Sequence, residues 1–234
     1  MSGILYVIGT PIGNLGDITK RALDTLGSVA CVYAEDTRVT HKLFDRFSIK
    51  TPLRSYREAA TPFQVAKTIQ EIIYDLKEGK DLAYVSDAGT PGISDPGNHL
   101  VANVAAAGYQ VVPIPGPSAL AAIISVCGYP AARPLFVGFL PKKKGHQTLM
   151  GVLKKALADD VTDCLVFYES PERIVKLLGE LIEWGMPLSL CLGRELTKMH
   201  EEILRGDVHL IYDILKKRQS IKGEICLTVH QGQS

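Results

Sequence analysis

A dense loop of small, rigid and acidic residues at positions 86–97 is the clearest sign of chemistry in this chain. It holds three glycines, two prolines and two aspartates, and it follows the apolar run 82–85, which is typical of a buried strand. Glycine lets backbone approach a ligand closely, and proline restricts the path of the chain. Ligands of open α/β sheets bind beyond the carboxyl ends of the strands. The loop therefore predicts a ligand site; the simpler alternative is a tight turn with a helix N-cap at Asp95.

Two further turns, at residues 9–16 and 115–119, are also rich in glycine and proline. The first lacks the G-x-G-x-x-G spacing, and Pro11 removes a backbone N–H where a pyrophosphate needs donors. No Walker P-loop sequence occurs either. Backbone groups in such turns suit a zwitterion that carries an adenine ring, such as S-adenosylmethionine, although a flavin or a sugar nucleotide fits them nearly as well.

Strand-like and helix-like segments alternate up to residue 114, which predicts an α/β domain with a largely parallel sheet. We expect strands at 4–8, 29–33, 53–56, 82–85 and 110–114, and helices at 17–26, 39–47, 63–76 and 99–107. These strands deliver all three turns to one sheet edge.

A proline-rich segment at residues 113–118 predicts a junction between two α/β domains, 1–115 and 116–234. In the second domain we expect helices at 119–125 and 171–184, with Ser170 as N-cap and Pro171 in the first position. Strands are expected at 135–139, 165–168, 188–192, around 203 and at 224–229, in a mixed sheet.

The composition narrows the possible partners and the expected location of the protein. The chain has 234 residues, 46% of them hydrophobic, and a net charge of +1, so its overall charge demands neither nucleic acid nor a membrane surface. The five cysteines lie mostly in apolar runs without zinc-type spacing, which indicates buried thiols and no metal site. No apolar stretch is long enough to span a membrane, and strand-like residues at the start leave no room for a signal peptide. We expect a soluble, cytoplasmic protein.

Nine ordered motifs make the chain similar to the tetrapyrrole methylase superfamily. They are residues 9–18, 34–38, 86–97, 113–119, 138–141, 167–171, 194–198, 200–202 and 222–224. They cover nearly the whole chain and most resemble the branch of that superfamily that modifies ribosomal RNA. The chain departs from the pattern of that branch at two places. An arginine follows Tyr56 where a histidine is expected, and the sequence ends soon after Val229, where many relatives continue.

The resemblance implies two α/β domains with the cofactor S-adenosylmethionine in the interdomain cleft, and a homodimer. It also implies methylation of the ribose 2′-hydroxyl of a cytidine in the decoding region of 16S rRNA, on the small ribosomal subunit. The residues implied in cofactor binding are Pro11, Asp87, Ala88, Gly89, Thr90, Ile93, Pro115, Gly116, Ser118, Ala119, Tyr168, Leu192 and Gly223. Asp87 is expected to hold polar groups of the cofactor; its alternative role is to cap the turn at Gly89.

Methyl transfer to a hydroxyl needs the oxygen held in line with the C–S bond, helped by a base or a network of charged donors. The candidate catalytic residues are Glu35, Asp36, Arg38, Glu169, Arg194, Glu195 and Lys198. The sequence leaves the base among them unnamed. Asp36 has the alternative role of a helix cap, and Arg194 and Lys198 that of an ion-paired surface with Glu195 and Glu202.

RNA contact is expected from local basic clusters, since a structured RNA is read largely by shape. The predicted RNA-binding residues are Arg38, Lys42, Lys142, Lys143 and Lys144. Two alternatives stay open. One is a methyltransferase of the same fold acting on a tetrapyrrole, whose Gly-Gly-Asp-Pro is replaced here by Ala88-Gly89-Thr90-Pro91. The other is a non-catalytic protein that senses the cofactor or docks on the ribosome.

Overall fold

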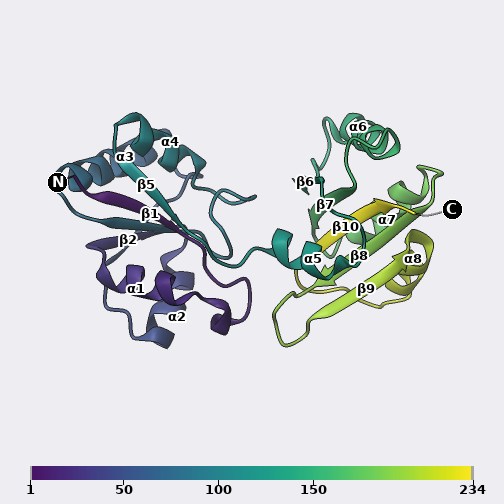
Figure 1. The fold of residues 1–234 in the computed structure, drawn as a ribbon, viewed down its shortest axis with the longest axis horizontal. Coiled ribbons are helices and arrows are strands. Elements are labelled where there is room, and N and C mark those ends of the chain that lie inside the picture. Colours follow the sequence, from purple (N-terminus) through teal and green to yellow (C-terminus); the bar gives the residue numbers. More distant parts are fainter. Residues whose placement is uncertain (1, 233–234) are drawn as a thin grey trace. The chain divides into compact units, whose positions relative to one another are not determined.

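The computed structural model describes residues 2–232, and the chain divides into two compact units, Met1–Ser118 and Ala119–Ser234. The predicted junction after Pro115 and this division lie in the same loop. The first unit is drawn in purple to teal in Figure 1 and the second in green to yellow.

The N-terminal unit is built on a parallel sheet. Its strands are β1 (Ile4–Ile8), β2 (Cys31–Ala34), β3 (Leu53–Ser55), β4 (Leu82–Val85) and β5 (Gln110–Ile114), in the order β3-β2-β4-β1-β5. Every pair is parallel, so all carboxyl ends lie along one edge. Residues of β4 are all buried because helices cover both faces.

Helices α3 (Pro62–Lys77) and α4 (Asn98–Ala106) lie on one face of this sheet, and η1 (Leu15–Asp17), α1 (Lys20–Ser28) and α2 (Thr37–Phe47) on the other side (Figure 1). The strands alternate between two apolar clusters. Leu5 and Tyr84 pack with α3 and α4, whereas Ile8 and Val85 pack with α1 and α2. Thr61 and Gln64 form a capping box at the start of α3, with proline in the first turn.

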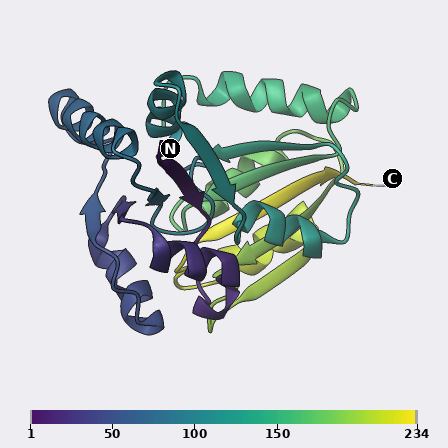
Figure 2. The same cartoon turned by 60° about the vertical axis from the view of Figure 1, so that its left-hand side comes forward.

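The C-terminal unit has a mixed sheet with the order β6-β7-β10-β8-β9. Its strands are β6 (Pro134–Phe139), β7 (Cys164–Glu169), β8 (Leu188–Arg194), β9 (Glu202–Asp207) and β10 (Ile225–Gln231). Among the described strand pairs of this second sheet, β6 and β7 are parallel and the others antiparallel, and β10 (yellow in Figure 2) runs through the middle of the sheet. Helices α6 (His146–Ala158), α7 (Ile174–Ile182) and α8 (Val208–Lys216) supply the core cluster of one face, and α5 (Ala119–Cys127) contacts β8 and β10.

Several predicted elements need correction. Helices α6 and α8 were not predicted: Lys154 and Lys155 interrupt the apolar pattern of α6, and α8 lies between the strands expected around 203 and at 224–229. The expected helix at 17–26 is a 3₁₀ turn followed by α1, whose N-cap is Thr19. The helix expected from Pro171 begins at Ile174, because Ser170 and Pro171 form a turn in which the Ser170 carbonyl accepts the N–H groups of Arg173 and Ile174.

The five cysteines are buried and free, which confirms the prediction of buried thiols. Within residues 2–232, no helix is long and apolar enough to cross a bilayer. In the same range, no three histidine, cysteine or acidic side chains converge as a metal site would require.

Candidate functional site

The carboxyl edge of the N-terminal sheet brings the three glycine- and proline-rich turns together. The N–H of Thr10 donates to the Gly89 carbonyl at 2.8 Å, and the N–H of Gly89 returns a bond to the Thr10 carbonyl at 3.1 Å. The Thr90 hydroxyl donates to the Pro117 carbonyl at 3.1 Å. Turns far apart in the sequence are therefore joined directly by hydrogen bonds.

Two glycines allow this close approach. A Cβ atom on Gly9 would lie 2.8 Å from the Cα of Gly116, and one on Gly116 would lie 2.5 Å from the Gly9 carbonyl oxygen. Such separations are too short for any side chain, so the two backbones touch. Gly89, with φ of 77°, and Ser94, with φ of 58°, hold left-handed backbone in the loop between β4 and α4. The sheet edge therefore brings backbone groups of these turns close together, where they can orient a small ligand.

Three acidic residues, Glu35, Asp36 and Asp87, follow β2 and β4 at this edge. The Asp87 carboxylate accepts the N–H of Asp36 at 2.9 Å, and the N–H of Asp87 donates to the Glu35 carboxylate at 3.4 Å. Burial raises the pKa of Glu35, and the neighbouring charge of Asp87 adds to the effect. Glu35 is therefore a carboxylate whose environment favours accepting a proton.

Asp36 and Arg38 are paired with each other. Asp36 is the N-cap of α2: its carboxylate accepts both the backbone N–H and the guanidinium of Arg38, at 2.9 and 3.0 Å. These bonds to Arg38 hold the pKa of Asp36 well below its usual range. The alternative role of Asp36 as a helix cap is thus present in the structure. Arg38 and Lys42 lie on the exposed surface of α2.

The sequence analysis did not single out Glu58, which braces the central loop. Its carboxylate accepts the N–H of Gly97 at 2.8 Å and that of His99 at 3.1 Å, and so caps α4 from another loop. The alternative role of Asp95 as the N-cap of α4 is not found, because Gly97 occupies that position and Glu58 supplies the cap. The neighbouring Arg57 donates to the Glu35 carbonyl at 3.3 Å. Glu58 and Gly97 are 39 residues apart, so this role of Glu58 is identified only by their contact in the folded structure.

Replacing Glu58 with alanine is expected to lower the free energy of unfolding of the N-terminal unit by about 1–3 kcal/mol, because two backbone donors lose their acceptor. Glu58→Gln keeps a neutral acceptor and should lose less. Urea unfolding curves measure both, with Glu71→Ala on the exposed side of α3 as the control. A Glu58→Ala curve that coincides with the control would contradict this role.

In the C-terminal unit, some of the predicted site residues lie in the apolar core, some lie in a loop, and some form ion pairs. Tyr168 lies on β7, and its hydroxyl accepts the N–H of Leu120 at 3.2 Å. Ala119 begins α5. Leu192 is fully buried in the apolar core and lies between β10 and β9 in the sheet, so it presents no exposed atom to a ligand. Glu169 is 3% exposed, and both its oxygens accept bonds from Arg173 at 2.7 Å.

The loop after β8 holds Arg194, Glu195 and Lys198 in a charged network. Lys198 donates to Glu195 at 2.9 Å and to Glu224 at 2.6 Å, and Arg194 pairs with Glu202 at 3.0 Å. The alternative role as an ion-paired surface is thus present. Glu195 and Thr197 have φ of 53° and 65°, which is strained backbone for residues with side chains. Gly223 makes room for the network, since a Cβ there would lie 2.5 Å from the Glu195 carboxyl carbon.

Glu202 is expected to make the C-terminal unit sensitive to acid. Bonds from Arg218 and Arg194 lower its pKa to about 2 against a reference of 4.5. Its stabilisation is thus present above pH 4.5 and lost as the pH falls through about 2. Glu202→Gln should cost about 2 kcal/mol of unfolding free energy at neutral pH, after discounting for partial exposure. The difference from the native chain should vanish near the lower pH, measured by denaturation at several pH values. Exposed Glu172→Gln is the control, and a pH-independent difference would contradict the prediction.

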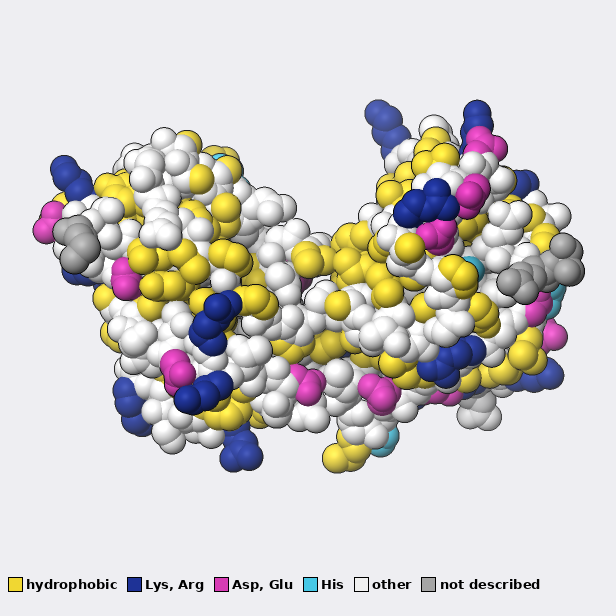
Figure 3. Space-filling view, in the orientation of Figure 1, with side chains coloured by type: hydrophobic (Ala, Val, Ile, Leu, Met, Phe, Trp, Pro, Cys, Tyr) yellow, Lys and Arg dark blue, Asp and Glu magenta, His cyan; other side chains and the backbone are white. Residues whose placement is uncertain are grey.

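The predicted RNA-binding lysines Lys142, Lys143 and Lys144 are exposed in the turn between β6 and α6. Figure 3 shows lysine and arginine side chains standing near α6 and apolar side chains gathered over β6. The candidate residues of the C-terminal unit therefore include a basic turn, a strained charged loop and a buried ion pair.

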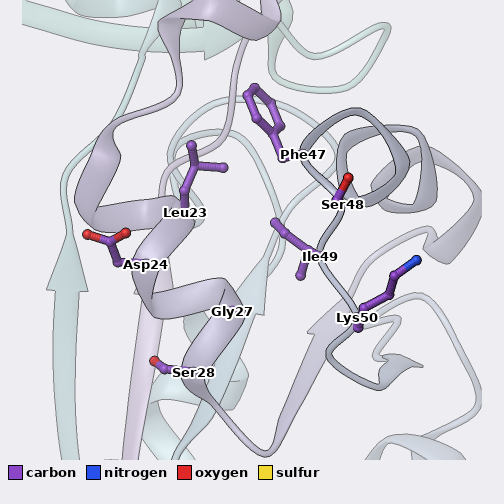
Figure 4. Close-up of a pocket in the computed structure, with 8 residues that line it drawn as sticks. All are labelled: Leu23, Asp24, Gly27, Ser28, Phe47, Ser48, Ile49 and Lys50. Carbon is purple, nitrogen blue, oxygen red and sulfur yellow. The ribbon is translucent and has the colours of Figure 1, made fainter.

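An open groove of about 600 Å³ lies elsewhere, between α1 and the segment that follows α2. Figure 4 shows Leu23, Phe47 and Ile49 turned toward this space. None of the predicted site residues lines it, so it does not define the functional site.

Comparison with known proteins identifies related chains. Residues 4–211 match the family of Tetrapyrrole (Corrin/Porphyrin) Methylases. The chain is 43% identical over 227 residues to "Ribosomal RNA small subunit methyltransferase I" of Thermotoga maritima, covering 97% of this chain and 98% of that relative. It is 40% identical over 234 residues to a Borrelia garinii protein of the same name, covering 99% and 100%.

Among solved structures, one similar chain is a uroporphyrin-III C-methyl transferase from Thermus thermophilus complexed with S-adenyl homocysteine. The TM-score is 0.63 at 16% identity, over 97% of this chain and 96% of that one. At this identity the likeness concerns the fold, and it confirms the predicted two-unit α/β architecture.

Proposed function

Because the chain belongs to the tetrapyrrole methylase family, we propose that it transfers a methyl group from S-adenosylmethionine to ribosomal RNA. The observation that carries the proposal is the direct contact of Gly9 with Gly116, which brings the backbones of two turns together at the sheet edge. We propose these turns as the cofactor cradle. Full-length relatives named as ribosomal RNA methyltransferases support the choice of substrate.

We further propose that the methyl acceptor is the ribose 2′-hydroxyl of a cytidine in the decoding region of 16S rRNA, within the small ribosomal subunit. The motifs at residues 34–38 and 194–198 support this choice over a tetrapyrrole, since the resemblance associates them with the RNA-modifying branch. We also propose that the protein acts as a homodimer in the cytoplasm, where ribosomes are assembled.

We further propose which residues hold the cofactor. Pro11, Gly9 and Gly116 are proposed to line its site, together with residues of the loop after β4: Asp87, Ala88, Gly89, Thr90 and Ile93. Pro115, Ser118, Ala119, Tyr168 and Gly223 are proposed as further contacts. When bound, S-adenosylmethionine supplies the methyl group. The chain's own part is to orient the hydroxyl and to accept its proton, for which Glu35 has the most suitable environment.

The test is incubation of the protein with radiolabelled S-adenosylmethionine and small ribosomal subunits from a strain that lacks the modification. Label on a cytidine ribose supports the proposal. Label on a base, or only on a tetrapyrrole offered in parallel, would overturn it. Binding of S-adenosylhomocysteine without any transfer would favour the non-catalytic alternative. Free 16S rRNA in a second reaction shows whether the assembled subunit is required.

A further inference from the structure

An exposed phenylalanine ends the edge strand of the C-terminal sheet. Phe139 is the last residue of β6 and is 59% exposed, while Gly138 before it and Leu140 after it are buried. β6 has a neighbour on one side only in the described sheet, so the ring stands at the sheet margin. The ring therefore presents an aromatic face that a ligand can contact at the sheet margin.

The ring is also held firmly. Its centroid lies 5.7 Å from that of Tyr168 in an edge-on arrangement, and Phe136 packs on the same tyrosine at 5.1 Å. The Leu140 carbonyl accepts two bonds from the Arg173 guanidinium, at 3.2 and 3.1 Å. Arg173 is itself fixed by buried Glu169. A rigid aromatic surface loses little conformational entropy when it binds.

The lysine turn follows directly, and it too is ordered by hydrogen bonds. The His146 N–H donates to the Lys143 carbonyl at 3.3 Å, and its ring bridges the Pro141 carbonyl at 2.9 Å and Glu180 at 2.7 Å. Lys142, Lys143 and Lys144 form no salt bridge with any described residue. Lys142 lies within about 10 Å of Phe139, since three residues span no more.

We propose that Phe139 stacks on a base of single-stranded RNA while Lys142, Lys143 and Lys144 contact the adjoining phosphates. The inference rests on the proposed function and names a part of its RNA site. Aromatic stacking beside unpaired positive charge is the usual chemistry of single-stranded RNA recognition. A second copy of the chain would bring three more lysines to this surface, so the charge favours a polyanion.

The test uses a single-stranded RNA oligonucleotide that contains the decoding-region cytidine. Phe139→Leu keeps an apolar contact with Tyr168 but removes the stacking face, and should weaken RNA binding by about 5- to 150-fold. Affinity for S-adenosylhomocysteine should stay the same. Phe139→Trp should retain RNA affinity. RNA should quench the fluorescence of the added tryptophan, whereas the signal of buried Trp184 should stay constant.

Phe63→Leu on α3 is the matched control, because that ring is 79% exposed in the other unit. RNA binding of Phe139→Leu equal to that of Phe63→Leu would overturn the proposal. So would a shift in sedimentation of Phe139→Leu with unchanged RNA affinity, which would assign the surface to a second copy. Methylation of small subunits by the native chain is measured separately, so failure of the stacking proposal and failure of the proposed function give different results.

Discussion

Replacing Gly116 with alanine is expected to reduce turnover by about 100-fold, because the added methyl group displaces the cofactor cradle by a fraction of an ångström or more. The new Cβ would lie 2.5 Å from the Gly9 carbonyl oxygen and 2.8 Å from the Gly9 Cα. Both atoms are backbone at the ends of neighbouring strands, so no flexible side chain can move aside. Titration calorimetry with S-adenosylhomocysteine should show a matching loss of affinity.

The same substitution should lower the free energy of unfolding of the N-terminal unit by about 1–3 kcal/mol, the usual cost of overpacking. Gly27→Ala is the control. This glycine lies in α1 with no atom within 4 Å of an added Cβ, so alanine should stabilise the helix by about 0.5–1 kcal/mol. Normal cofactor affinity in Gly116→Ala would show that the glycine contact does not form the binding surface.

Replacing Glu35 with glutamine is expected to reduce turnover by about 10²- to 10⁴-fold, the contribution of a positioned general base. The other candidate acids are committed elsewhere: Asp36 to Arg38 and the helix cap, Glu169 to Arg173, and Glu195 to Lys198. Burial and then the charge of Asp87 raise the pKa of Glu35, whereas hydrogen bonds lower the pKa of Asp36 and of Glu195. In the native chain, turnover should therefore rise as the pH increases through this raised pKa. The pH profile of Glu35→Gln should lack this rise.

Stability should change in the opposite direction from activity. A raised folded-state pKa means that Glu35 stabilises the fold fully below its unfolded pKa and loses that contribution as the pH rises through the folded value. At neutral pH, Glu35→Gln should thus be at least as stable as the native chain in urea unfolding. Glu71→Gln is the control for the loss of an exposed carboxylate. Full turnover in Glu35→Gln would remove Glu35 from the reaction.

Local patterns were sufficient to predict the frame of the N-terminal unit. Its five strands follow from apolar runs between turn residues, and the glycine- and proline-rich loops follow from composition. The same approach missed α6 and α8 and placed the start of α7 too early, because lysines obscure the apolar period of α6 and the Ser170 turn resembles a helix start.

By itself the sequence determined which segments become strands, which loops are backbone-rich, and which family the motifs resemble, because these depend on neighbours along the chain. The tertiary structure alone decided the partners that lie far apart in the sequence. Glu58 reaches Gly97 and His99, and Glu35 lies beside Asp87, whereas Asp36 with Arg38 and Glu169 with Arg173 pair within four residues of each other. The physical reason is that a carboxylate's pKa and partners depend on atoms within a few ångströms, and for Glu58 and Glu35 folding brings those atoms from distant parts of the chain.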